Sequence, residues 1–236
     1  MHNVVHLAVW LLLCGITPLS AAESPTRVMV SYDVLKGSFK GITITETYTL
    51  TQGRYRIERV SKAVGLLALI KPETIRETSE GTLTAKGLRP NTYIQKRELD
   101  TERNTRADFD WSAKRITLTD HTGSRTLPLS AGTQDLLSAM YQFMFVPLNN
   151  VATLSFYMTN GKKLDIYNYR ITPDQSVTVP LGTFKALYVA SVPEADASRT
   201  EIWLAEQHAN FPYKMDITDK DGDKLSQVIT KFEFVP

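Results

Sequence analysis

Hydrophobic and polar residues alternate along most of this 236-residue chain. In the clearest case, residues 42–50, the side chains of Ile42, Ile44, Tyr48 and Leu50 face one way, and threonines between them face the other. A period of two is typical of a β-strand with one buried face, and β-branched threonine suits the exposed face of a sheet. This segment is therefore predicted to be a half-buried strand.

Further runs with the same period follow each other along the chain, separated by short turns that contain glycine, proline, asparagine or aspartate. They cover 28–35, 54–60, 74–80, 91–99, 105–111, 115–119, 151–158, 163–171, 176–179, 184–192, 200–205, 213–218 and 225–234. Short connections of this kind join antiparallel neighbours, and Asp221-Gly222 is a strong signal for a tight hairpin. The sequence predicts an all-β fold: a curved antiparallel sheet or β-barrel of about a dozen strands. Closure would remove exposed strand edges.

One apolar run, 63–70, breaks the alternation and lies between Lys62 and Lys71. It contains Leu66, Leu67 and Leu69. One interpretation is a buried strand or short helical turn that plugs the end of a barrel. The other is an apolar lip at the mouth of a cavity, which touches a lipid or membrane surface with the lysines near head groups.

A helical period occurs at 133–145, where Gly132-Thr133 offers a cap and Asp135 lies in the first turn. An apolar stripe runs along this segment, and Pro147 ends it. We expect this one α-helix to pack against the sheet or inside the barrel. Its residues either fill the core or line a ligand cavity, to which flexible methionines adapt. The stripe that we consider for ligand contact contains Leu137, Met140, Tyr141, Phe143 and Met144.

The first residues predict a cleaved secretory signal peptide at 1–22. An apolar run covers 4–16, which is short for a membrane span, and Ser20-Ala21-Ala22 supplies small residues before a cleavage site. No later segment is apolar enough to span a membrane as a helix. We expect a periplasmic protein with a single domain at 23–236.

The composition limits the partners and the thiol chemistry that we expect. The net charge of +2 gives no sign of a nucleic-acid partner, and the 42% hydrophobic content is enough for a core. Cys14, the only cysteine, lies in the predicted leader. The mature chain then has no disulfide or zinc-thiolate site.

No motif for catalysis, metal or cofactor binding is present. A hydrolase centred on His208 is a minor alternative, because one histidine near carboxylates has little specificity. Residues 219–223 contain three aspartates, but their glycine does not fall where a calcium loop needs it. We expect a protein that is not an enzyme and has no cofactor.

The chain resembles an uncharacterised family of bacterial envelope proteins, domain-of-unknown-function family 3108. The features that carry the resemblance extend over nearly the whole mature chain. They are Tyr32-Asp33-Val34, the 64–69 run, Phe109-Asp110-Trp111, the 132–138 helix start, 179–184, Trp203-Leu204, Pro212-Tyr213-Lys214 and 219–223. The family has no assigned activity, so the resemblance implies no catalytic residue. A weaker similarity, limited to 203–223, is to periplasmic lipoprotein carriers of the half-barrel type, which wrap a sheet around a helix and an apolar cavity.

Two functional hypotheses follow. The first is an exported, non-enzymatic binding protein that holds a lipid or other apolar ligand between sheet and helix. Its candidate ligand-binding residues are Leu66, Leu67, Leu69, Leu137, Met140, Tyr141, Phe143 and Met144. The second is a structural or scaffolding protein of the envelope that binds a protein partner.

Overall fold

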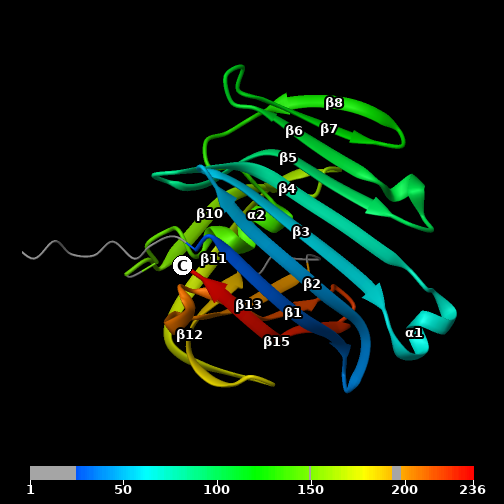
Figure 1. Cartoon of the computed structure of the whole chain (residues 1–236), viewed down its shortest axis with the longest axis vertical. Coiled ribbons are helices and arrows are strands. Elements are labelled where there is room, and N and C mark those ends of the chain that lie inside the picture. The colour runs from blue at the N-terminus through cyan, green and yellow to red at the C-terminus, as the bar shows by residue number, and fades with distance from the viewer. Residues whose placement is uncertain (1–24, 149, 193–197) are drawn as a thin grey trace, which may run out of the picture.

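A computed structural model of the chain describes residues 25–148, 150–192 and 198–236. The predicted leader, 1–22, lies outside the described residues. The fold is one large curved antiparallel sheet with few helices, as predicted (Figure 1). Its elements are β1 (Arg27–Lys36), β2 (Phe39–Thr51), β3 (Arg54–Ala63), α1 (Gly65–Ile70), β4 (Thr74–Thr84), β5 (Gly87–Arg97), η1 (Thr101–Arg103), β6 (Thr105–Asp110), β7 (Arg115–Asp120), β8 (Gly123–Pro128), β9 (Gln134–Asp135), α2 (Leu136–Gln142), β10 (Thr153–Thr159), β11 (Leu164–Val179), β12 (Gly182–Ser191), β13 (Arg199–Ala205), η2 (Glu206–His208), β14 (Phe211–Thr218) and β15 (Lys224–Val235).

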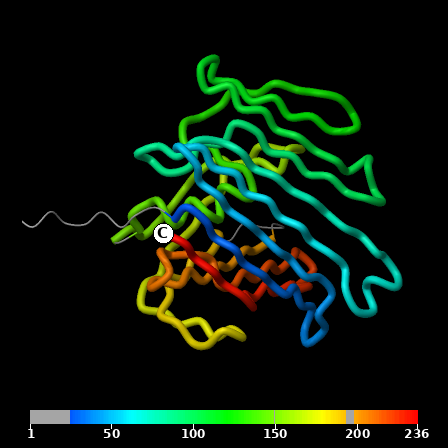
Figure 2. Tube along the Cα trace, viewed as in Figure 1, coloured from blue at the N-terminus to red at the C-terminus, as the bar shows by residue number. Residues whose placement is uncertain are grey.

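The described chain starts and ends in the middle of the sheet. The strand order is β8-β7-β6-β5-β4-β3-β2-β1-β15-β14-β13-β12-β11-β10-β9, so the first and last long strands are neighbours. Figure 2 shows them side by side, in blue and red. From this seam hairpins run outward as a meander to β8 on one side and to β10 on the other, which is the arrangement that the short turns predict, and β9 pairs in parallel with β10.

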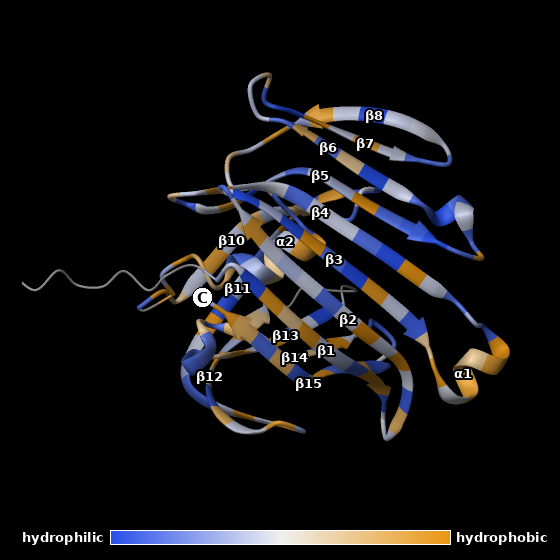
Figure 3. Cartoon of the chain, in the orientation of Figure 1, coloured by the Kyte–Doolittle hydropathy of each residue, from blue (hydrophilic) through white to orange (hydrophobic). Residues whose placement is uncertain are grey.

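The sheet curls so that its two halves enclose one core. The main cluster of buried side chains contains Tyr48 and Ile57 from the first half and Val177 and Tyr213 from the second. Hydrophobic and polar residues alternate visibly along the strands in Figure 3. Alternation therefore has its expected physical origin: one face of most strands is buried in the concavity, and the other faces solvent.

The far ends of the two halves also meet. Thr105 Oγ1 on β6 donates a hydrogen bond to the Asn160 carbonyl oxygen in the β10–β11 turn, at 2.8 Å. Arg125 on β8 donates to the Lys162 carbonyl oxygen in the same turn. These contacts draw the sheet toward a barrel, although β8 and β9 stay separate edges in the strand order.

Helix α2 lies between the two halves of the sheet (Figure 1). Its N-cap is Asp135, whose carboxylate accepts hydrogen bonds from the Leu137 and Ser138 backbone amides, each at 2.9 Å. The Ser138 hydroxyl accepts from the Asp135 amide and completes a capping box. The helix is shorter than the predicted 133–145, and the predicted Gly132-Thr133 cap is wrong. The reason is that Asp135 satisfies the first-turn amides itself.

One further prediction needs correction. Segments 163–171 and 176–179 form one strand, β11, because the expected turn at Pro173-Asp174 is a bulge between Thr172 and Gln175. Within the predicted strand 213–218, Asp216 is buried although it carries a charge. It lies 2.6 Å from Lys224 Nζ, so its charge is paired. With the short strands β8 and β9, the described residues form fifteen strands, where about a dozen are predicted.

Candidate functional site

Helix α1 sits at the end of the β3–β4 connection, far from the C-terminus (Figure 1). It has no buried residue. Leu66 is 72% exposed, Leu69 81% and Ile70 76%, and Leu67 is the least exposed of the four large side chains, at 37%. These four side chains make up what we call the α1 rim, an apolar stretch that is plain in Figure 3. The interpretation as a buried plug is therefore wrong, and this run forms an apolar lip.

The backbone holds the α1 rim close to β2. The Val64 amide donates to the Gly41 carbonyl oxygen at 2.8 Å, and the Lys71 amide closes the last turn on Leu67 at the same distance. A Cβ built at Gly41 would lie 3.3 Å from Leu67 Cδ2, tighter than ordinary packing. Gly41 therefore lets the helix approach the strand.

Lysines flank the α1 rim. Lys62 and Lys71 are exposed, and neither has a carboxylate within 4.0 Å among the residues that the structure describes. Lys40 is paired with Asp33 at 3.2 Å. Unpaired lysines next to exposed leucines are the pattern of a surface that contacts lipid head groups.

A small pocket opens beneath the helix, with a volume of about 160 Å³. It lies over two cross-strand rows of the concave face: Ser61, Ile75 and Arg97 are register partners in one row, and Ile42 and Ala63 in the next. We call it the α1 pocket, and its lining is Ile42, Ser61, Ala63, Leu67, Lys71, Glu73, Ile75 and Arg97. It therefore combines an apolar wall with three charged side chains.

Two of these charged groups are incompletely partnered: Glu73 is buried, and Arg97 is half-buried with an enclosed Nε. Glu73 is 8% exposed, and its Oε1 accepts from the Leu99 amide at 3.2 Å. Its Oε2 and Arg97 Nε have no hydrogen-bond partner among the described residues. Arg97 Nη1 and Glu73 Oε2 lie 4.0 Å apart, a contact too long for a hydrogen bond. Buried polar atoms of this kind are uncommon in folded proteins and call for an explanation.

A second group of charges lies deeper on the concave face. Arg59 Nε donates to Glu46 Oε1 at 2.7 Å and its Nη1 lies 3.6 Å from Glu77 Oε2. The Tyr93 hydroxyl donates to Glu77 Oε1 at 2.6 Å. Burial acts to lower the pKa of Arg59, but Glu46 and Glu77 outweigh it and hold that pKa above its ordinary value. These groups satisfy one another, so the arrangement is a structural link across β2, β3 and β4.

The eight predicted ligand-binding residues fall into two separate places. Leu66, Leu67 and Leu69 lie on the α1 rim, and Leu67 also lines the α1 pocket. The five on the α2 segment pack into the two core clusters. Tyr141 stacks on Tyr48 with 5.3 Å between ring centres and meets Phe211 at 5.2 Å. The geometry therefore exposes the first three, whereas Met140 and Met144 are half-buried and the other three are buried.

Sequence reasoning missed Glu73 and Arg97. The sequence places Arg97 in a run of charged residues, 97–103, that is typical of a solvated hairpin end, yet Arg97 alternates in phase with buried Tyr93 on β5. Glu73 directly follows Pro72 and precedes β4, where no period is established. The phase of Arg97 relative to Tyr93 is the signal that could have identified it.

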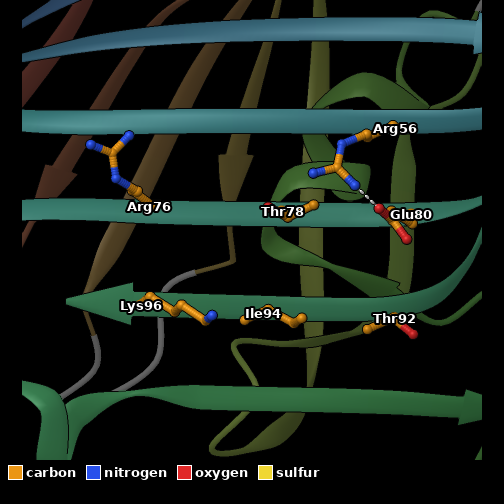
Figure 4. Close-up of a pocket in the computed structure, with 7 residues that line it drawn as sticks. All are labelled: Arg56, Arg76, Thr78, Glu80, Thr92, Ile94 and Lys96. Atoms are coloured by element: carbon orange, nitrogen blue, oxygen red, sulfur yellow. Dashed lines mark hydrogen bonds and ion pairs between the residues drawn. The ribbon is translucent and has the colours of Figure 1, made fainter. Parts of the chain in front are cut away.

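Charged residues that border two other surface grooves are paired with each other. Figure 4 shows seven side chains along β3, β4 and β5, on the face opposite to buried Ile57, around a shallow groove of about 290 Å³. Arg56 pairs with Glu80, and Arg76 lies 3.3 Å from Glu98. A groove of about 480 Å³ near Lys185 is likewise bordered by carboxylates that pair with that lysine, at 3.3 Å. Paired surface charges of this type are ordinary in a solvated sheet.

His208 packs against aromatic side chains. Its Nδ1 is 2.5 Å from the Tyr213 hydroxyl, and Phe184 and Phe232 pack around the ring. Burial lowers the pKa of His208. Within the described ranges, no three His, Cys, Asp or Glu side chains are grouped to hold a metal ion. No helix there is long and apolar enough to cross a membrane.

Among solved structures, the chain is similar to the crystal structure of a β-barrel-like protein of domain of unknown function DUF1849 from Brucella abortus. The two chains are 12% identical with a TM-score of 0.57, and the match covers 89% of this chain and 98% of that one. At this identity the likeness shows a shared fold alone. No curated protein matches the chain. The family described as protein of unknown function (DUF3108) matches residues 27–229, so the chain belongs to that family, as the sequence resemblance predicts.

Proposed function

We propose that the protein is a non-enzymatic binding protein of the periplasm that engages a lipid through the α1 rim. The exposure of the rim carries the proposal. Most surface apolar residues occur singly, whereas here Leu66, Leu69 and Ile70 stand out together on one short helix without a partner in the described chain. Full burial of a leucine or isoleucine stabilises by about 1.5–3 kcal/mol, so three of them supply a substantial driving force for contact with acyl chains.

We therefore propose a lipid site at the α1 rim and not between the sheet and helix α2, where the sequence suggests it. The α2 side chains already fill the space against Tyr48 and Phe211, whereas α1 leads directly into the α1 pocket through Leu67. A lipid at the rim needs no rearrangement of the core.

Native mass spectrometry of the purified protein, with lipid extraction of the same sample, tests this proposal. We expect a bound mass that is released as lipid, and binding to phospholipid vesicles in a flotation assay. The triple variant Leu66→Ser, Leu69→Ser, Ile70→Ser should lose both. The control is Ile166→Ser on β11, a 53% exposed isoleucine far from α1 in the strand order. A purified protein that carries no lipid and does not bind to vesicles would overturn the proposal.

The alternative, an envelope scaffolding protein, draws support from β8. Its residues are mostly exposed, and within the described chain it pairs with β7 alone. Such an edge offers free backbone groups to a strand of another protein. A photo-reactive side chain at Thr126 should then capture a specific partner in cells, and the same group at Lys185 on the internal strand β12 should not. Equal capture, or none, at both positions argues against this role.

A further inference from the structure

We propose that the α1 pocket binds the zwitterionic headgroup of an amphiphile, a phosphate linked to a primary ammonium, while the acyl chain lies along the α1 rim. This inference deepens the proposed function and rests on it. It names the class of lipid and the residues that select it.

The incompletely partnered atoms define what the ligand must offer. Arg97 Nε is a donor without an acceptor, and Glu73 Oε2 is an acceptor without a donor, both inside the described chain. Leaving a buried donor or acceptor unsatisfied costs more than an ordinary hydrogen bond returns. The long separation between Arg97 and Glu73, 4.0 Å, leaves each free for another group. A ligand that satisfies both must present an acceptor and a donor close together.

Charge favours a zwitterion over a simple anion or cation. Arg97 and Lys71 supply two positive charges to the α1 pocket, and Glu73 supplies one negative charge. A phosphate can accept from the Arg97 guanidinium and the Lys71 ammonium, a combination well suited to phosphate recognition. A primary ammonium can donate to Glu73. A quaternary ammonium carries the same charge but has no N–H to donate.

Size limits the ligand inside the pocket to a headgroup. The α1 pocket has a volume of about 160 Å³. Pockets that enclose a whole drug-sized ligand measure about 300–1,000 Å³. The acyl chain must therefore lie outside, and Leu67, which belongs both to the lining of the pocket and to the α1 rim, marks the path that it takes.

Titration with single-chain lipids below their micelle concentration tests the headgroup directly, by native mass spectrometry of the whole protein. The probes are lysophosphatidylethanolamine, lysophosphatidylcholine and lysophosphatidic acid, with free phosphoethanolamine as the chain-free probe. We expect lysophosphatidylethanolamine to bind at least about ten-fold more tightly than lysophosphatidylcholine, the loss that a missing hydrogen bond to a charged group produces. Lysophosphatidic acid should also bind more weakly than lysophosphatidylethanolamine, because it lacks the ammonium that faces Glu73. Free phosphoethanolamine should bind most weakly of all, because it gains nothing from the α1 rim.

Three variants assign the contacts. Glu73→Gln should abolish the preference for lysophosphatidylethanolamine over lysophosphatidylcholine. Arg97→Gln should lower the affinity of the protein for all three lysolipids. Arg76→Gln, on the opposite face of β4, is the matched control and should change nothing; thermal unfolding checks that each variant is folded. Equal affinity for the three lysolipids, or a preference that survives Glu73→Gln, overturns the headgroup assignment and leaves the lipid-binding function intact. Failure of every lysolipid to bind overturns both.

Discussion

The Arg59 guanidinium lies 2.7 Å from the Glu46 carboxylate in the interior of the protein, and the two residues are direct cross-strand partners on β3 and β2. Glu77 is the partner of Arg59 on the other side, on β4. Three neighbouring strands thus carry a row of buried charges through the concave face. Since each charge depends on its neighbour, the row should fix the register of these strands.

The first prediction concerns this row. Arg59→Gln should lower the free energy of unfolding by about 3–5 kcal/mol, because Glu46 and Glu77 would stay buried without a cation. Arg56→Gln, on the exposed face of the same strand, should cost less than about 1 kcal/mol. Urea denaturation of both variants at neutral pH measures the difference. Equal losses would mean that the row contributes no more than a surface ion pair.

The second prediction concerns pH. Burial raises the pKa of Asp135 from 3.8 to about 6, although hydrogen bonds from Ser79, Ser138 and Leu137 act to lower it. A raised pKa means that the folded protein holds the proton more tightly than the unfolded chain. This contribution to stability is therefore full below about pH 4 and is lost as pH rises through about 6.

Asp135→Asn isolates that contribution, because asparagine also caps a helix but does not titrate. Relative to the variant, the wild-type protein should lose about 2 kcal/mol of unfolding free energy between pH 4 and pH 7. Denaturant unfolding of both proteins at intervals across this range gives the curve. A difference that stays constant with pH would show that Asp135 keeps an ordinary pKa.

The two apolar segments give a third prediction. Leu137→Ala on α2 should cost about 2–5 kcal/mol, because it leaves a cavity in the core. Leu66→Ala on α1 should change the free energy of unfolding by less than about 0.5 kcal/mol, because that side chain is already in water. Thermal or urea unfolding distinguishes the two. A large loss for Leu66→Ala would mean that α1 is part of the folded core rather than a free rim.

The same pair of leucines shows what sequence can and cannot predict. The strands were predictable because one face of each is buried, which imposes a period of two that survives in the sequence. Helix α1 and helix α2 are both short and apolar, and composition cannot tell which is enclosed by the sheet. That outcome depends on how the fifteen strands curl, which no local pattern records.

The buried charges were hidden for a related reason. Glu46 lies in phase with Ile44 and Tyr48, and Arg59 in phase with Ile57, so each occupies an inward position of its strand. A charged residue in phase with the apolar face of a strand can be predicted from the sequence to be buried. The partners of such a residue cannot be predicted in this way, because the arrangement of Glu46, Arg59 and Glu77 depends on the register of three strands. The α1 pocket was missed in the same way, since Arg97 and Glu73 meet only after β4 and β5 pair.

A fourth prediction tests the contact between the two ends of the sheet. Gly161, at φ +80°, packs against β6, and a Cβ there would lie 2.7 Å from Thr105 Oγ1. Gly53 has a similar φ of +74°, but nothing lies within 4 Å of its Cβ position. Both glycine-to-alanine variants bear the backbone strain of about 1 kcal/mol or more, but only Gly161→Ala adds a clash. We expect Gly161→Ala to be the less stable of the two in urea denaturation, and equal stability would show that the turn does not press on β6.

The last prediction concerns the lysines beside the α1 rim. A lysine near an anionic membrane surface contributes about 1 kcal/mol, so the double variant Lys62→Gln, Lys71→Gln should bind vesicles containing anionic lipid about 30-fold more weakly than wild type. The matched control is Lys86→Gln, Lys114→Gln, two exposed lysines in the β4–β5 and β6–β7 turns, at the ends of these strands opposite to α1. Vesicle flotation at low and at 1 M salt measures the effect. At 1 M salt the screening length falls to about 3 Å, so the two double variants and the wild type should converge on the residual binding that the apolar side chains provide. A defect of the Lys62 and Lys71 variant that persists undiminished at high salt would mean that these lysines act by shaping the α1 pocket and not by attracting a charged surface.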